Sequence, residues 1–269
     1  MKNLLRSLQH FSKTSTKHVE LFGKLTLRDL GVYVSDADAL KYMQDNDYPL
    51  GDKAFQLSHS IHQCRYDSET SRFIRHPWKS SPADSLGCST LFESESVTLC
   101  WFVLPPGHAL PLHDHPGMTV WQRVMHGRLH ISTIVTRASP STVKTAAATP
   151  ATVLFDGVVD GREEAIPPSD IFTLGERDGS VLHEVRNVDA AMPALFVDII
   201  SPPYLQSPTN ISCTYYQVEP ARKEGQRLAG LPSDCSVHWK LKAGDDVLLH
   251  PRPDYAGPAM RPLVYVGGD

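Results

Sequence analysis

Residues 107–127 read GHALPLHDHPGMTVWQRVMHG and combine a pair of histidines with the pattern of a β-strand. His113 and His115 flank Asp114, and side chains two positions apart on a strand point to the same face. The two imidazoles can therefore enter one space, which is the geometry of a metal site. A β-branched and aromatic run over residues 119–124 follows, and Gly127 then marks a turn.

The spacing around this histidine pair resembles the first half-motif of the cupin barrel, with five residues between Gly107 and His113. Cupins usually place a glutamate ligand four or five positions after the second histidine. Thr119 and Val120 stand there in this chain, so the carboxylate ligand is missing. A third ligand must therefore come from another part of the sequence.

His183 is the best candidate for the third ligand. It lies in the segment VLHEVRN, which resembles the second cupin half-motif because Asn187 follows the histidine four positions later. The match is partial, since Ser180 and Asp178 replace the usual glycine and proline before the histidine. A histidine pair alone is often no more than two polar residues on a strand, but the flanking glycines and His183 favour a metal site.

Three imidazoles suit iron, zinc, copper or nickel, and neutral ligands leave the full dipositive charge of the ion for other ligands. Zinc on three histidines also fits a site that activates water for hydrolysis. The number of ligands does not choose among these metals, so the choice depends on the wider sequence.

Three further segments resemble the thiol dioxygenases of the cysteamine dioxygenase and plant cysteine oxidase family. They are PPGHALPLHDHPGM at residues 105–118, LFVDIISPPY at 195–204 and CTYY at 213–216. The resemblance implies a double-stranded β-helix that holds a mononuclear non-haem Fe(II) on three histidines, here His113, His115 and His183. It also implies a reaction that adds both atoms of O2 to a thiol and gives a sulfinic acid.

The resemblance also implies roles for two residues near the end of the apolar run 194–200. Asp198 interrupts this run, and a buried carboxylate must find partners or lose its charge. We expect it to anchor the substrate amine or to accept a hydrogen bond near the metal; a purely structural carboxylate is the alternative. Tyr204 stands where the family places a pocket tyrosine, which could donate to dioxygen or substrate, although it could also simply fill a proline-rich corner.

Cys213 and Tyr215 would face the same side of a strand, and the resemblance places such a pair close to the iron, where animal members form a thioether crosslink. An ordinary buried thiol beside a tyrosine is the alternative. The remaining histidines, among them His108 and His126, fit surface or loop positions. His130 lies on a predicted strand and is the reserve ligand.

The chain reads as one cupin-type domain with an all-β core, a jelly-roll-like antiparallel barrel. We expect a mainly helical or loop extension at residues 1–90, the barrel core at 91–220 and a closing segment at 221–269. Strands are predicted at residues 97–104, 119–125, 128–136, 151–155, 170–174, 181–187, 194–200, 212–219, 237–241 and 246–250. Surface loops are predicted at 138–150 and 157–169.

Residues 1–19 are basic and lack acids, with apolar side chains at helical spacing. Such a segment can be a mitochondrial transit peptide, but an amphipathic helix that packs on the barrel is the favoured interpretation. Short helices are also predicted at residues 26–30 and 35–46, the second with a capping box at Ser35 and Asp38.

The composition is that of an ordinary globular protein, with 41% hydrophobic residues and a net charge of −4. Nothing indicates nucleic-acid binding, and no apolar run approaches the roughly 20 residues that span a membrane. The five cysteines are odd in number and widely spaced without a CxxC pair, which favours a reduced intracellular setting. We expect a cytoplasmic monomer.

The expected partners are therefore O2 and a small aminothiol or a peptide that begins with cysteine. An aminothiol could occupy two metal positions through thiolate and amine, which leaves one for O2. The sequence does not choose among cysteamine, free cysteine and N-terminal cysteine, nor between oxygen sensing and sulfur metabolism. Two other classes stay open: a non-catalytic cupin that binds a small ligand, and a zinc or manganese cupin with isomerase or hydrolase chemistry.

Overall fold

The computed structural model describes residues 2–30, 56–57, 64–67, 72–75, 85–138, 143–144, 146–175, 180–190, 193–204, 212–221, 241–262 and 265–266. The predicted helix at 35–46 and nearly all of the predicted strand at 237–241 lie outside these ranges. Two small sheets pair β1 (Gln56–Leu57) with β16 (Tyr265–Val266) and β2 (Cys64–Asp67) with β3 (Arg72–Arg75).

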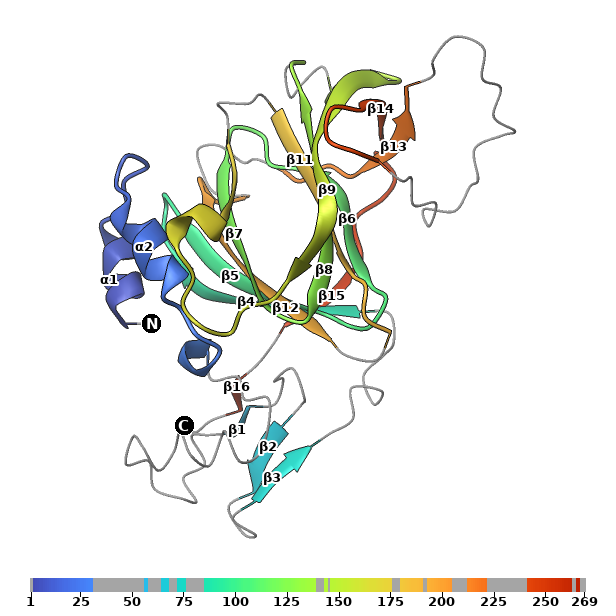
Figure 1. The fold of residues 1–269 in the computed structure, drawn as a ribbon. Coiled ribbons are helices and arrows are strands. Elements are labelled where there is room, and N and C mark those ends of the chain that lie inside the picture. Colours follow the sequence, from blue (N-terminus) through green and yellow to red (C-terminus); the bar gives the residue numbers. More distant parts are fainter. Residues whose placement is uncertain are drawn as a thin grey trace.

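Two six-stranded sheets form the body of the protein (Figure 1). The first sheet has the order β10 (Phe172–Leu174), β7 (Thr119–His126), β12 (Ala194–Ser201), β5 (Thr98–Leu104), β4 (Ser85–Glu93), β15 (Ala259–Pro262). The second sheet has the order β13 (Tyr216–Pro220), β14 (Asp246–Pro251), β9 (Thr149–Asp160), β8 (Arg128–Thr136), β11 (Ser180–Asn187), β6 (Ala109–Asp114). Within these two sheets all neighbours are antiparallel except β15 and β4.

The chain alternates between the two sheets as it advances. From β5 to β8, each strand lies in the sheet opposite to its predecessor, and the same holds from β9 to β12. This alternation winds the chain into a double-stranded β-helix whose two sheets enclose a common interior (Figure 1). The predicted all-β cupin fold is confirmed.

Most predicted strands lie within two residues of the observed ones, and the prediction at 128–136 matches β8. Three predictions were wrong. Residues 157–160 are not a loop but the end of β9, which pairs with β8. The strand predicted from Ser212 begins only at β13, and Asp170 belongs to the 3-10 helix η4 (Pro168–Asp170) that precedes β10.

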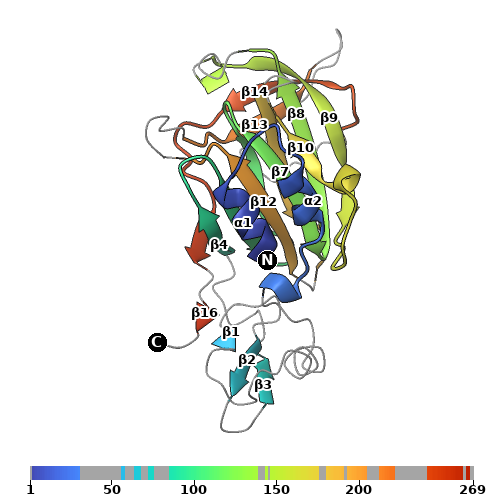
Figure 2. The same ribbon diagram turned by 90° about the vertical axis from the view of Figure 1, so that its left-hand side faces the viewer.

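The N-terminal helices cover the outer face of the first sheet (Figure 2). They are α1 (Lys2–Gln9), α2 (Lys17–Gly23) and the 3-10 helix η1 (Arg28–Leu30). Leu4 and Leu8 of α1 are buried in one cluster with Trp101 and Trp121 of the sheet, as expected for an amphipathic helix that packs on the barrel. No helix in the described residues is long and apolar enough to cross a membrane.

Strand β12 is buried on both faces because the helices cover one face and the barrel interior lies on the other. Leu195, Val197 and Ile199 pack in the cluster beneath the helices. The alternating residues, which include Asp198, point into the barrel, and this double burial explains why residues 194–200 read as a continuous apolar run.

Arg123 of β7 joins the helices to the barrel although its side chain is fully buried. Its guanidinium donates to the carbonyl oxygens of Phe22, Gly23 and Leu25 at the end of α2 and just beyond it. The same group donates to the carbonyls of Arg162 and Glu164 in the segment before η4. Burial lowers the pKa of Arg123 to about 10, so the group stays charged and its five carbonyl partners stabilise the charge.

We expect Arg123→Lys to destabilise the protein by about 2 kcal/mol, which lowers Tm by about 4 °C, because an ammonium cannot reach all five carbonyls. Thermal unfolding followed by circular dichroism measures this loss. Arg128→Lys is the matched control, because Arg128 forms an exposed pair with Asp160. Equal Tm values for the two variants would contradict the role of Arg123.

Candidate metal centre

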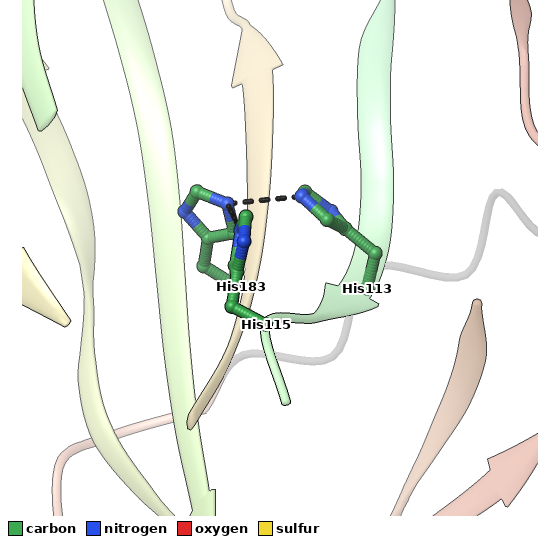
Figure 3. A group of neighbouring side chains, drawn as sticks. All are labelled: His113, His115 and His183. Atoms are coloured by element: carbon green, nitrogen blue, oxygen red, sulfur yellow. Dashed lines mark hydrogen bonds between the residues drawn. The ribbon is translucent and has the colours of Figure 1, made fainter. Parts of the chain in front are cut away.

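Three histidines converge in the barrel interior (Figure 3). His113 of β6 and His183 of β11 lie directly opposite each other in the second sheet. His115 follows the end of β6, where its backbone N–H donates to the Val181 carbonyl and holds it beside β11. The Nε2 atom of His183 lies 2.9 Å from Nε2 of His115 and 3.1 Å from Nε2 of His113. Among the described residues, no other group of potential ligands meets in this way.

The hydrogen bonds of the outer ring nitrogens fix which nitrogen faces the centre. His113 Nδ1 lies 2.8 Å from the Pro111 carbonyl oxygen, which can only accept, so Nδ1 carries the hydrogen. The Tyr204 hydroxyl donates to the Asp114 carbonyl at 2.5 Å and therefore accepts from His115 Nδ1 at 2.7 Å. The Nε2 atoms of His113 and His115 thus carry lone pairs that point at the centre.

The arrangement of the three Nε2 atoms is better explained by a shared bound cation than by hydrogen bonds among the three rings. His183 Nε2 carries at most one hydrogen and can donate to only one of its two neighbours, so at least one of the two approaches of about 3 Å has no hydrogen bond. Burial lowers the pKa of His113 to about 4 and holds the pKa values of His115 and His183 well below the usual value. All three rings are therefore neutral at pH 7, the form that binds metal ions.

Asp114 lies between the two ligands on β6 and its side chain anchors the segment that follows Ser212. One carboxylate oxygen accepts from the Thr214 backbone N–H at 2.7 Å, and the other accepts from the Tyr216 hydroxyl at 2.9 Å. No role was predicted for Asp114 from the sequence. Its position between two inward-facing histidines could have indicated this role, because strand alternation turns the Asp114 side chain to the opposite face.

A cavity of about 290 Å³ opens beside the histidines. It is bordered by all four predicted catalytic residues and by His113 and His115. Its other lining side chains come mainly from β4 and β5 and were not predicted: Cys88, Thr90, Glu93, Thr98, Cys100, Phe102. They were missed because β4 was not recognised, which left no neighbour for the inward face of β5.

Asp198 lies in the cavity wall and is 2% exposed. Its Oδ1 atom has no hydrogen-bond partner in the described part of the chain. Burial raises the pKa of Asp198 to about 8, and the neighbouring amide of Gln122 acts in the opposite direction. The carboxyl group therefore lies where a cationic group of a bound molecule could stabilise its charge.

Cys213 and Tyr215 both border the cavity, although Cys213 precedes the strand. Tyr215 forms an isolated β-bridge with His113, and Gly257 lies against its hydroxyl. A Cβ atom at Gly257 would lie 2.5 Å from that hydroxyl oxygen, so glycine is required there. Burial and the Asp114 carboxylate raise the pKa of the Cys213 thiol to about 12, against hydrogen bonds with Tyr215 and Tyr204, so the thiol is neutral.

Among the residues that the structure describes, the other histidines do not join the centre. His130, the reserve ligand, lies on the outer face of β8, where its Nε2 atom is 3.4 Å from Asp156. That prediction was wrong because Leu129 and Ile131, its neighbours along β8, occupy the inward positions. His126 pairs with Glu163 on the surface at 2.7 Å.

The comparisons with known proteins agree with this geometry. The PCO_ADO family model matches residues 21–260. The chain belongs to the PCO_ADO family. The human protein named 2-aminoethanethiol dioxygenase is 31% identical over 64% of this chain and 67% of its own length, and the mouse protein of the same name is 33% identical over 64% and 70%. Plant cysteine oxidase 2 of Arabidopsis thaliana is 31% identical over 47% of this chain and 42% of its own length.

In this PCO_ADO protein, the Tyr204 hydroxyl accepts from Nδ1 of His115, one of the three candidate ligands. We expect Tyr204→Phe to weaken metal affinity about tenfold, because His115 Nδ1 loses the acceptor that orients the ring. Titration with Fe(II) against a competing chelator measures this change. Tyr255→Phe is the control, since the Tyr255 ring packs against Tyr215 and the substitution keeps that ring. Wild-type metal affinity in Tyr204→Phe would contradict a role of Tyr204 in orienting His115.

Proposed function

We propose that this protein is a non-haem iron thiol dioxygenase that adds both atoms of O2 to the thiol of cysteamine or of an N-terminal cysteine. The product is a sulfinic acid. The observation that carries the proposal is the meeting of three neutral imidazole nitrogens beside a cavity, without a carboxylate ligand. The names of the relatives support the same reaction.

His113, His115 and His183 would hold Fe(II) through their Nε2 atoms. Bound iron supplies the redox chemistry that joins O2 to the thiol. Because all three ligands are neutral, the site keeps more positive charge than a site with a glutamate ligand. That charge favours the thiolate form of the substrate, which is the reactive form.

The Asp198 carboxylate would accept a hydrogen bond from the amine of the substrate. An amine that stays protonated beside this buried carboxyl, instead of coordinating the iron, lowers the pKa of Asp198 and lets it carry a charge at neutral pH. The cavity of about 290 Å³ is near the lower end of the range for small-ligand pockets, which suits an aminothiol or the first residue of a peptide.

The other wall residues would position these groups. Tyr204 orients His115, while Cys213 and Tyr215 close the cavity beside His113. Tyr215 lowers the pKa of the Cys213 thiol, and this proximity supports the crosslink that the family resemblance implies. The bond itself stays a prediction, which the mass of the intact protein tests.

We also propose that the chain acts as one cupin-type domain, as a monomer in the cytoplasm. The burial of Leu4 and Leu8 supports a structural role for the N-terminal helix over a transit peptide. Size-exclusion chromatography with light scattering and fluorescence microscopy of a C-terminally tagged chain test these two points.

Anaerobic purification followed by metal analysis tests the proposal against its alternatives. We expect close to one iron ion per chain, bound at the three-histidine site. We also expect O2 uptake that depends on an added aminothiol. Zinc or manganese with no thiol-dependent O2 uptake would favour the other metal-dependent chemistries. Uptake rates with cysteamine, free cysteine and a peptide that begins with cysteine then rank the substrates.

A further inference from the structure

The barrel interior contains two apolar clusters, one on each side of the level of the metal centre. One cluster includes Val124, Ile131, Val185 and Phe196, which come from four different strands. The other cluster includes residues four positions along the same strands: Val120, Val135, Val181 and Ile200. Between them, each strand contributes one inward side chain.

These four intervening side chains are all polar, and we call them the polar layer: Gln122, Thr133, His183 and Asp198. Gln122 of β7 lies opposite Asp198 of β12, and Thr133 of β8 lies opposite His183 of β11. Directly opposed residues of neighbouring strands point to the same face, so each pair enters the interior together. The layer therefore extends from the metal centre to the wall that carries Asp198.

Every member of the polar layer has a buried atom without a hydrogen-bond partner. These atoms are Gln122 Nε2 and Oε1, Thr133 Oγ1, His183 Nδ1 and Asp198 Oδ1. Gln122 and His183 are 0% exposed, and Thr133 is 4% exposed. Buried polar atoms without partners are costly and rare, so a group of them between two apolar clusters requires an explanation.

The chemistry of these atoms is complementary. The Gln122 amide both donates and accepts, the Thr133 hydroxyl does the same, and the Asp198 carboxyl accepts. The Gln122 amide is close enough to lower the pKa of Asp198, yet neither of its polar atoms has a hydrogen-bond partner. Polar groups that are close but not in direct contact are commonly bridged by buried water.

We propose that the polar layer binds ordered water in the barrel interior and that Gln122, through this water, positions the Asp198 carboxylate toward the cavity. Gln122 is then a positioning residue, since it touches neither the metal ligands' Nε2 atoms nor the cavity. The benefit for catalysis rests on the proposed function, in which Asp198 receives the substrate amine. The water site itself does not depend on that function.

The consequence concerns the charge of Asp198. Water held by Gln122 and Thr133 donates to the carboxylate and favours its ionised form before the substrate arrives. The titratable groups around the cavity that Asp198 faces are Cys100 of β5, Cys88 and Glu93 of β4, His113 and His115 at β6, and Tyr204, Cys213 and Tyr215. Burial raises the pKa of Asp198, whereas the uncharged amide of Gln122 lowers it.

Gln122→Leu tests the proposal, because leucine fills the site without a polar atom. Infrared titration of the iron-loaded protein follows the protonated carboxyl band of Asp198, identified by its loss in Asp198→Asn. We expect the midpoint of Gln122→Leu to lie about one pH unit above the wild-type midpoint. At pH 7, kcat/KM for cysteamine should fall about tenfold, mainly through KM, with iron content unchanged.

Two variants at Thr133 supply a matched pair. Thr133→Ser keeps the hydroxyl and should match the wild type, whereas Thr133→Val loses it and should raise the Asp198 midpoint in the same direction as Gln122→Leu. This pair also tests the proposal if Gln122→Leu does not fold. Unchanged midpoints in the folded Gln122→Leu and Thr133→Val proteins would overturn it. The infrared result needs no turnover, so a wild type without thiol oxidation would refute the proposed function and leave this test intact.

Discussion

His183→Ala is expected to lose its bound iron and more than about 99% of its thiol-dependent O2 uptake. His183 comes from β11, whereas the other two histidines come from β6 and the residue after it, so its removal leaves only one side of the centre. Loss of a ligand should exceed the 10- to 100-fold effect that is typical for a hydrogen-bond partner of a ligand. Metal analysis and an oxygen electrode measure both results on one preparation.

His130→Ala is the matched control for this prediction, because His130 faces outward on β8 and pairs with Asp156. It should keep wild-type iron content and wild-type O2 uptake. His113→Ala and His115→Ala should each behave as His183→Ala does. Wild-type iron content in His183→Ala would contradict its assignment as a ligand.

Asp198→Asn should reduce sulfinate formation by about 10- to 100-fold at pH 7 while it keeps the fold and most of the iron. Asparagine preserves the volume and one acceptor oxygen but cannot carry the charge that a substrate amine requires. The initial rate with cysteamine, together with the iron content, measures the loss. Glu93→Gln tests whether Glu93 binds the substrate amine instead, since Glu93 also borders the cavity. A loss in Glu93→Gln with none in Asp198→Asn would assign the amine to Glu93.

The same substitution should also change how stability depends on pH. The pKa of Asp198 is about 8 in the folded protein and about 4 in an unfolded chain, so folding binds a proton between these values. This contribution to stability is complete below about pH 4 and is lost as the pH rises through about 8. Asp198→Asn removes that loss, so its Tm at pH 8 should equal or exceed the wild-type Tm. A lower Tm with a normal rate would instead indicate a purely structural carboxylate.

Much of the core could be predicted from sequence because the relevant signals are local. Strand β8 begins at Arg128 directly after the turn residue Gly127 and is rich in β-branched residues, and its bounds were predicted correctly. The inward direction of His113, and the place of Asp198 on the same face as Phe196 and Ile200, followed from alternation. The N-terminal helix was favoured because Leu4 and Leu8 lie on one helical face.

The remaining features depend on partners far away in the sequence. β4 has no clear period of its own, and its pairing with β5 and β15 makes it a strand. The end of β9 looks like a loop until β8 supplies its hydrogen bonds. Gln122 was unremarkable within an aromatic and β-branched segment, because its significance depends on Asp198 opposite it and on the apolar residues on either side. The polar layer thus requires the three-dimensional register.

The mass of the product formed under isotopically labelled O2 tests the central claim most directly. The iron-loaded protein is incubated with cysteamine, or with a peptide that begins with cysteine, and the sulfur product is analysed by mass spectrometry. Thiol dioxygenation predicts a sulfinic acid in which both added oxygen atoms carry the label. A product that is only disulfide, or a sulfinate whose oxygen comes from water, would contradict it.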